Sequence, residues 1–329
     1  MLFDLTARRA WMLAGATLVL LALMAVGVSL GSERLSLTEV WDGLTNPAHT
    51  SERVIVWDLR LPRVLLAVVV GANLAVAGAL LQGVTRNPLA DPHLLGISAG
   101  SGVVGALLLV RGVDIGLEAK VALSILGGLA GGAFIYAMAW RGGVSPTRLT
   151  LAGVAVSFLL ISMTTAILAS SRLFAQQSLN FVGGSLFARG WDDLRAVWPY
   201  TVVGLVLALG ASASLNIMAL GEDAAAELGV RTDWVRAIVV VLAVVLSGAA
   251  VSVAGLMGFV GLIIPHVARA LVGQDYRYVL VASALLGAIL LVGSDTLARN
   301  ILGETELPAG VVTAGVGAPF FLYLLRQVR

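Results

Sequence analysis

Residues 82–96 lie between two long apolar stretches and read Gln-Gly-Val-Thr-Arg-Asn-Pro-Leu-Ala-Asp-Pro-His-Leu-Leu-Gly. Within residues 86–92, an arginine, an asparagine, an aspartate and two prolines interrupt a chain that is otherwise mostly apolar. Irregular backbone at membrane depth persists only where protein or a water-filled cavity satisfies its polar groups. We therefore interpret this segment as the lining or the gate of a pathway.

The composition around this segment is typical of a membrane protein. Of the 329 residues, 59% are hydrophobic and only 12% are charged, whereas charged residues make up about a quarter of a soluble domain. The apolar runs reach the roughly 20 residues that a helix needs to cross about 30 Å of hydrocarbon. We predict an all-α, polytopic protein with one transmembrane domain over residues 1–329, surrounded by membrane lipid.

We expect ten transmembrane helices, two of which, at 94–110 and 259–272, are short. Short or Gly/Pro-interrupted segments in the two halves of a transporter mark its transport site. Glycines such as Gly71 and Gly78 are spaced so that neighbouring helices can approach closely. The predicted spans cover approximately residues 10–30, 62–82, 94–110, 120–140, 149–171, 194–212, 234–255, 259–272, 278–297 and 308–326.

The charges beside these spans predict that both termini are cytoplasmic. The first apolar run, 10–30, is longer than the about 7–15 residues of a signal peptide, so we interpret it as a retained span. Basic residues in short loops and near span ends favour the cytoplasmic side. On that side we place Arg8, Arg9, Arg141, Arg148, Arg326 and Arg329.

Several functions are excluded by what the sequence lacks. No cysteine is present, which excludes disulfides and thiolate sites, and the net charge of +2 does not indicate nucleic acid. The single lysine, Lys120, follows Glu118-Ala119, so the chain has no Gly-Lys-Ser/Thr phosphate loop. We therefore expect a non-catalytic chain without its own ATPase site.

The histidines and serines do not form a recognisable catalytic or metal-binding pattern. His93 and His266 each follow a proline and have no second histidine or carboxylate at ligand spacing, so we expect no metal site. Ser98, Ser101 and Ser157 have no base nearby in the sequence. We expect these hydroxyls to bond to the backbone of their own helices.

Arg60 and Arg63 stand at the head of the second predicted span, in Arg60-Leu61-Pro62-Arg63. Proline suits the first turn of a helix, and the two arginines then lie one turn apart and project the same way. Two interpretations remain open. The side chains either snorkel to the membrane surface or form a basic patch for an acidic partner outside the membrane.

Asp295 and Arg299 stand at the end of the ninth predicted span with the i, i+4 spacing of a helical ion pair. An intramembrane carboxylate is a functional candidate by default, and alone it would suggest proton coupling. Because Arg299 is one turn away, we favour a local ion pair over a proton relay. Arg299 can also join the basic patch of Arg60 and Arg63.

Residues 219–230, between the sixth and seventh spans, read Ala-Leu-Gly-Glu-Asp-Ala-Ala-Ala-Glu-Leu-Gly-Val. Acidic residues in a first turn complement the helix dipole, alanines propagate the helix, and Gly229 suits a C-terminal cap. We predict a short helical docking segment. Its core is Gly221, Glu222, Asp223, Ala224, Ala225, Ala226, Glu227, Leu228 and Gly229.

Several motifs, in order over roughly residues 58–325, resemble the permease subunits of type II ABC importers for iron–siderophore, haem and cobalamin. In the first half they are Leu-Arg-Leu-Pro-Arg at 59–63, Gly-Ala-Asn-Leu-Ala-Val-Ala-Gly at 71–78 and Arg-Asn-Pro-Leu-Ala-Asp-Pro at 86–92. In the second half they are Gly-Phe-Val-Gly-Leu-Ile-Ile-Pro-His at 258–266, followed by Arg269, then Glu-Leu-Pro-Ala-Gly at 306–310 and Gly-Ala-Pro-Phe-Phe-Leu at 317–322.

The resemblance implies a homodimer of ten-span subunits in the bacterial inner membrane, with two ABC subunits that use ATP and Mg and a periplasmic substrate-binding protein. No cofactor is expected on this chain. By similarity, Arg60, Arg63 and Arg299 would receive acidic residues of the binding protein, and residues 219–230 would couple to the ATPase. Asn87 and Leu89 would form the gate, and the span from Thr150 would line the pathway.

We therefore predict the transmembrane subunit of an ATP-driven importer for a large metal chelate. Haem is favoured slightly over a ferric siderophore, and cobalamin is the alternative after these. A rival from another class is a proton-coupled secondary transporter that uses Asp295.

Overall fold

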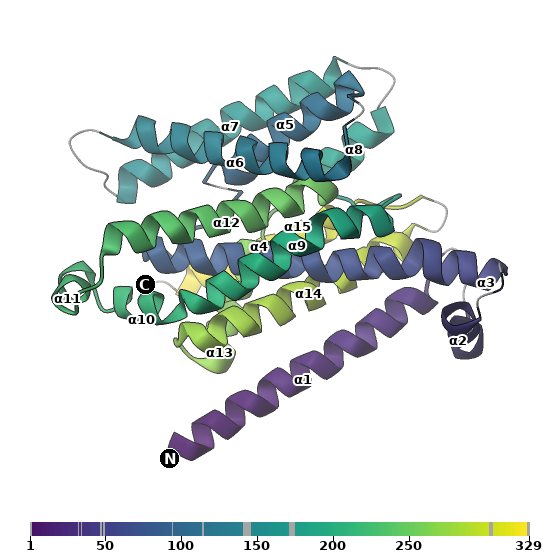
Figure 1. The fold of residues 1–329 in the computed structure, drawn as a ribbon, viewed down its shortest axis with the longest axis horizontal. Coiled ribbons are helices and arrows are strands. Elements are labelled where there is room, and N and C mark those ends of the chain that lie inside the picture. The colour runs from purple at the N-terminus through teal and green to yellow at the C-terminus, as the bar shows by residue number, and fades with distance from the viewer. Residues whose placement is uncertain are drawn as a thin grey trace.

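The computed structural model describes residues 2–31, 33, 35–46, 48, 50–93, 95–113, 115–140, 146–170, 175–302 and 305–327. Every regular element in these ranges is a helix (Figure 1), which confirms the predicted all-α fold. Seven helical segments of the described chain are long and apolar enough to cross a membrane, and three more are apolar but shorter. Together they correspond to the ten predicted spans.

The boundaries agree closely with those expected, because long apolar runs bounded by polar or Gly/Pro-containing segments specify helix length. Apart from the start of α1, each end lies within four residues of its predicted position. The long helices are α1 (Leu2–Ser29), α4 (Leu61–Thr85), α6 (Leu117–Ala139), α7 (Pro146–Ala169), α9 (Trp191–Gly210), α12 (Thr232–Ala254) and α14 (Tyr276–Ile301). The shorter apolar helices are α5 (Ile97–Arg111), α13 (Val260–Val272) and α15 (Ala309–Gln327).

Short helices fill the connections. The π-helix η1 (Val54–Arg60) was not predicted and leads directly into α4. Four more were not predicted either, namely α2 (Leu37–Thr45), α3 (Ser51–Arg53), α8 (Ala175–Gly183) and α10 (Ser212–Met218). The short helix predicted within residues 219–230 is present as α11 (Glu222–Glu227). In Figure 1 the two chain ends lie toward the end of the bundle that carries α10 and α11.

Helix α4 forms the core of the bundle and packs against α12, α13 and α14 (Figure 1). Two of its glycines allow this close approach. A Cβ on Gly71 would lie 2.2 Å from the carbonyl oxygen of Gly287, and a Cβ on Gly78 would lie 2.0 Å from that of Gly261. The predicted role of Gly71 and Gly78 in helix packing is confirmed.

Helices α5, α6 and α7 form a layer beside α12 (Figure 1). Here the expectation for the serines is wrong at two positions. Ser98 shares a 3.0 Å hydrogen bond with Ser247 of α12, and Ser101 donates to the backbone oxygen of Ser124 in α6 at 2.7 Å. The helices approach so closely that a neighbouring helix supplies a partner for each fully buried hydroxyl.

Candidate functional site

Two non-helical segments, one in each half of the chain, supply residues to the site. The first joins α4 to α5, and Arg86 begins it with a left-handed φ of 50°. The second, residues 255–259, joins α12 to α13 and contains left-handed Gly255 and Phe259, with φ of 71° and 70°. A bulky residue in this region is strained and persists only where its surroundings fix it.

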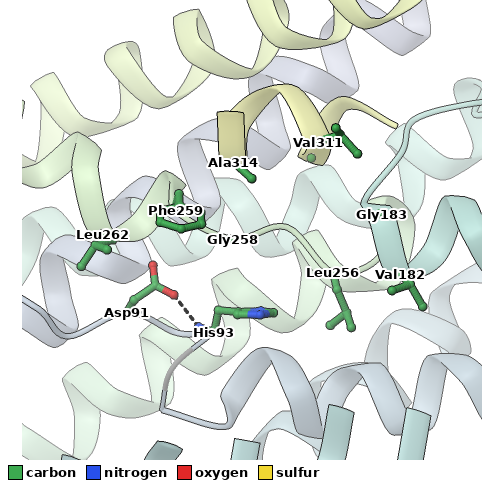
Figure 2. A pocket seen from close by; sticks show the side chains of 11 residues that line it. Asp91, His93, Val182, Gly183, Leu256, Gly258, Phe259, Leu262, Val311 and Ala314 are labelled. Carbon is green, nitrogen blue, oxygen red and sulfur yellow. Dashed lines mark hydrogen bonds between the residues drawn. The ribbon is translucent and has the colours of Figure 1, made fainter. Parts of the chain in front are cut away.

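The two interruptions meet at one cavity of about 400 Å³ (Figure 2). This volume lies in the usual range for small-molecule sites, about 300–1,000 Å³. The first interruption supplies Asp91 and His93, while α8 and α15 close the other sides. The remaining lining residues are Val182, Gly183, Leu256, Gly258, Phe259, Leu262, Gly310, Val311 and Ala314.

The polar edge of this cavity is built by Asp91 and His93. Asp91 is 3% exposed, and its Oδ1 accepts a 2.7 Å hydrogen bond from the backbone N–H of His93 (Figure 2). Nδ1 of His93 is buried and has no hydrogen-bond partner in the described part of the chain. The wall of a largely apolar cavity thus contains a buried imidazole nitrogen that lacks a hydrogen-bond partner in the described structure.

Backbone hydrogen bonds tie the apolar walls of the cavity together. Leu256 donates to the carbonyl of Phe181 at 2.8 Å, and Gly310 donates to that of Gly184 at 2.9 Å. A Cβ on Gly310 would lie 2.2 Å from the oxygen of Gly183. The end of α8 and the start of α15 can approach this closely only because glycine stands there.

A second polar group, the arginine cluster, consists of Arg60, Arg63, Asp295, Arg299 and Glu306. Arg63 contacts Asp295 at 3.0 Å and Glu306 at 2.8 Å. The predicted ion pair between Asp295 and Arg299 is confirmed at 3.3 Å. It is a charge contact at that distance, because Nε of Arg299 forms no hydrogen bond in the described structure.

Arg60 is held by the end of α1, where it donates to the backbone oxygens of Val28 and Ser29, each at 2.9 Å. It also donates to the carbonyl of Glu33. The three arginines of the cluster are only 6–8% exposed. They therefore engage the protein itself rather than snorkel to a surface.

The 219–230 segment folds as predicted around α11. Gly221 precedes the helix with φ of 118°, and Gly229 follows it with φ of 78°. The N–H of Gly229 bonds to Ala226 at 2.9 Å and that of Val230 to Ala225 at 3.0 Å, which is the Schellman pattern. The predicted C-terminal cap at Gly229 is confirmed.

One face of this segment is anchored and the other is free. Ala225 is completely buried, whereas Leu228 is 62% exposed. Asp223, Ala226 and Glu227 are also exposed. The side chain of Glu222 lies outside the described structure.

Residues 18–327 match the FecCD transport family. The chain belongs to this family. Its fold is that of a type II ABC importer permease, and it aligns over 97% of its length with a solved metal-chelate type ABC transporter in an inward-facing conformation. That match has a TM-score of 0.83 and 30% identity and covers 100% of the solved chain.

Named relatives of this FecCD chain carry different cargoes. The Fe(3+)-citrate import system permease protein YfmD of Bacillus subtilis is 42% identical over 93% of this chain and 91% of its own. The cobalamin import system permease protein BtuC of Halobacterium salinarum is 40% identical over 92% and 85%. The hemin transport system permease protein HmuU of Yersinia pestis is 37% identical over 96% and 95%.

The predicted gate residues of the FecCD chain fall in the first interruption. Oδ1 of Asn87 accepts a hydrogen bond from the backbone N–H of Leu89 at 2.9 Å, and Leu89 is 44% exposed. Thr150 lies in α7, but its side chain lies outside the described structure. The gate therefore stays a prediction.

Sequence reasoning missed several contacts of this FecCD site. Arg63 and Asp295 are 232 positions apart, and the cavity needs α8, which was not predicted. Gln82, a polar residue inside an apolar helix, was the available signal for a further contact. The described residues contain no group of three or more His, Cys, Asp or Glu that could hold a metal.

Proposed function

We propose that this chain is the transmembrane subunit of an ATP-driven importer and forms the pathway for a large metal chelate. One observation carries the proposal. The two irregular segments that interrupt the membrane-spanning helices meet at a single cavity. Irregular backbone at membrane depth lines a cavity or lies buried in protein, and broken helices in both halves mark transport sites.

The proposed complex is a homodimer of this chain in the bacterial inner membrane. Two ATP-binding subunits, which use ATP and Mg, and a periplasmic substrate-binding protein complete it. The chain itself holds no cofactor and hydrolyses no ATP in this proposal. Its single lysine, Lys120, lies in α6 and outside any phosphate-binding loop.

The 219–230 segment would receive the force of ATP binding and hydrolysis. Its exposed Leu228 and short, capped helix suit insertion into a groove of a partner. The chain ends lie toward the same end of the bundle (Figure 1), so both termini would be cytoplasmic with it.

Asn87 and Leu89 would form the cytoplasmic gate, with Thr150 on the pathway-lining helix α7. Because the chain has no cysteine, a cysteine introduced at Leu89 is unique in each subunit. We expect the two copies in a homodimer to cross-link and to block uptake. Uptake that continues after complete cross-linking contradicts this gate.

The arginine cluster would dock the substrate-binding protein. Arg63 and Arg299 pair with carboxylates inside the cluster, and Arg60 lies near Glu33. Glu306, whose side chain is 32% exposed, must yield its place beside Arg63 to a carboxylate of the partner. Binding of the substrate-binding protein to the Arg63→Gln complex tests this, and unchanged affinity contradicts it.

The cargo is a metal chelate of the iron–siderophore, ferric citrate, haem or cobalamin type. Haem, which the sequence favoured slightly, has a named relative at 37% identity, while the ferric citrate relative is at 42%. The cavity supports a cargo with an apolar body and a polar group that can meet His93. It carries no feature that requires the propionates of haem.

ATP-driven uptake into proteoliposomes that contain the assembled complex tests the proposal. Haem, a ferric siderophore, ferric citrate and cobalamin are compared with and without ATP. We expect one class of chelate to be taken up. This uptake should require ATP on the side of the membrane that carries the ATP-binding subunits. Uptake driven by a pH gradient without ATP, and abolished by Asp295→Asn, would instead support the secondary transporter.

The contacts of Asp295 argue against that rival. Asp295 is 1% exposed and pairs with both Arg63 and Arg299. A proton relay needs a carboxylate that can reach water or another relay group. Here two guanidinium groups occupy its surroundings.

A further inference from the structure

A series of polar contacts, most of them hydrogen bonds, runs from α10, next to the 219–230 segment, to the wall of the cavity. We propose that this series, the Asn216–Gln82 chain, transmits movement of the 219–230 segment to the cavity and the gate. It consists of Asn216, Asp275, Tyr276, Arg269 and Gln82. The proposal rests on the proposed importer function and names how its two sites are connected.

The chain begins where α10 meets the junction of α13 and α14. Nδ2 of Asn216 donates to Oδ1 of Asp275 at 2.8 Å, and Oδ1 of Asn216 accepts from the backbone N–H of Tyr276 at 2.8 Å. The amide of Asn216 thus uses both its donor and its acceptor on one turn. A movement of α10 must carry the start of α14 with it.

Helix α10 is itself fastened to the 219–230 segment through the backbone. Ala219 donates to the oxygen of Leu215 at 3.0 Å, and Gly221 donates to that of Met218 at 3.2 Å. These bonds leave no flexible linker between Asn216 and α11.

The middle of the chain crosses from α14 to α4. The guanidinium of Arg269, near the end of α13, interacts with the side chain of Tyr276 and donates a hydrogen bond to Oε1 of Gln82. Tyr276 is only 7% exposed. A Cβ on Gly83 would lie 2.8 Å from its hydroxyl, so glycine beside Gln82 leaves the space for this ring.

The chain ends on the first turn of α13, beside the cavity. Nε2 of Gln82 donates to the backbone oxygens of Gly261 and Leu262 at 3.2 and 3.1 Å. Pro265 has no N–H, so the oxygen of Gly261 lacks the donor that a helix normally supplies four residues later. Gln82 provides that donor, and Leu262 lines the cavity.

Gln82 also lies four residues before Arg86, where the first interruption starts. A Cβ on Gly221 would lie 4.0 Å from Nη1 of Arg86, so the 219–230 segment and this interruption are neighbours. Gln82 is therefore a positioning residue. It links the end of α4, next to the proposed gate in the first interruption, to the cavity wall on α13.

A simple packing role is the alternative, and α4 offers a matched control. Nδ2 of Asn73 donates to the hydroxyl of Thr201 at 2.9 Å, and Asn73 is fully buried. This bond joins α4 to α9 but has no connection to α10 or α13 through side chains. Asn73→Leu removes one buried amide from the same helix without interrupting the Asn216–Gln82 chain.

The experiment measures cargo imported per ATP hydrolysed by the assembled complex in proteoliposomes. For Gln82→Leu and Asn216→Leu we expect this ratio to fall about tenfold, within the 5–150-fold typical of coupling between sites. ATP hydrolysis should remain within about twofold, and Asn73→Leu should preserve the ratio. The double variant should lose no more than one single variant, because either change interrupts the same chain.

An unchanged ratio in both single variants, or losses that multiply in the double variant, overturns the inference. If Gln82→Leu prevents assembly, Gln82→Glu replaces it, since Glu keeps the acceptor for Arg269 but loses the donor to Gly261 and Leu262. A Gln82→Glu complex with the unchanged ratio also overturns the inference. If the unsubstituted complex imports nothing with ATP, the proposed function itself fails.

Discussion

At its Arg60 end, α4 is held by charges, whereas at its Thr85 end it is held mainly by amide, hydroxyl and carbonyl groups. Arg63 shares Asp295 with Arg299 and contacts Glu306 at 2.8 Å. Gln82, at the other end, donates to two carbonyls of α13 and accepts from one arginine. Both side chains are buried, with Arg63 8% and Gln82 4% exposed.

The two kinds of contact differ in how readily they exchange. Removing one partner of a buried ion pair costs about 3–5 kcal/mol, because a buried charge is left without compensation. A neutral hydrogen bond contributes about 0.5–1.5 kcal/mol net and can be replaced by another. We therefore expect the Arg60 end to stay fixed during transport and the Thr85 end to move.

The largest effect is expected for Asp295→Ala, at the fixed end. This change leaves Arg63 with Glu306 alone and Arg299 with a single bond to the carbonyl of Gly27. The free energy of unfolding in detergent should fall by about 3–5 kcal/mol. Chemical or thermal unfolding of the purified chain measures it.

Glu306→Gln is the matched control within the arginine cluster. Glu306 is about one-third exposed at its side chain, so solvent screens its charge and the loss should be at most about 1 kcal/mol. Equal losses for Asp295→Ala and Glu306→Gln would show that burial does not distinguish the two carboxylates. The picture of a fixed end would then be wrong.

A smaller effect is expected for Gly78→Val, between the two ends. The new Cβ would lie 2.0 Å from the backbone oxygen of Gly261, so α4 and α13 must separate. Overpacking of this kind costs about 1–3 kcal/mol, measured by thermal unfolding. Gly293→Val in α14, where a Cβ meets nothing within 4 Å, should have little effect, and a similar loss there would contradict the contact.

The helices could be predicted because their signals are local. Length and apolarity define each span, and the cap at Gly229 depends on residues within one turn. The Asp295–Arg299 pair was accessible for the same reason, since i, i+4 residues of a helix are neighbours whatever the tertiary fold.

The contacts that position the site are not local. Arg63 meets Asp295, and Gln82 meets Gly261, only after α4, α13 and α14 have packed. The sequence showed Gln82 as a polar residue in an apolar helix and Pro265 as an interruption of another. Only the folded structure shows that Gln82 donates to the carbonyl of Gly261 the hydrogen bond that Pro265, which has no N–H, cannot donate.

The smallest effect concerns Asp275, at the moving end, and it depends on pH. Partial burial raises the pKa of Asp275. The hydrogen bonds from Asn216 and from the Arg277 N–H, and the charges of Arg277 and Arg9, together lower it by more. The pKa therefore lies below its ordinary value of 3.8. The resulting stabilisation is present above about pH 3.8 and is lost as the pH falls through the lower, folded-state pKa.

Asp275→Asn isolates this contribution, because asparagine keeps the N-cap of α14 but cannot ionise. The difference in unfolding free energy between the unsubstituted chain and this variant should shrink by about 0.5–1 kcal/mol between pH 5 and pH 3. Other carboxylates titrate equally in both chains and cancel. A pH-independent difference would mean that the carboxylate charge of Asp275 does not hold the junction of α10 and α14, and the moving end would then rest on its neutral hydrogen bonds alone.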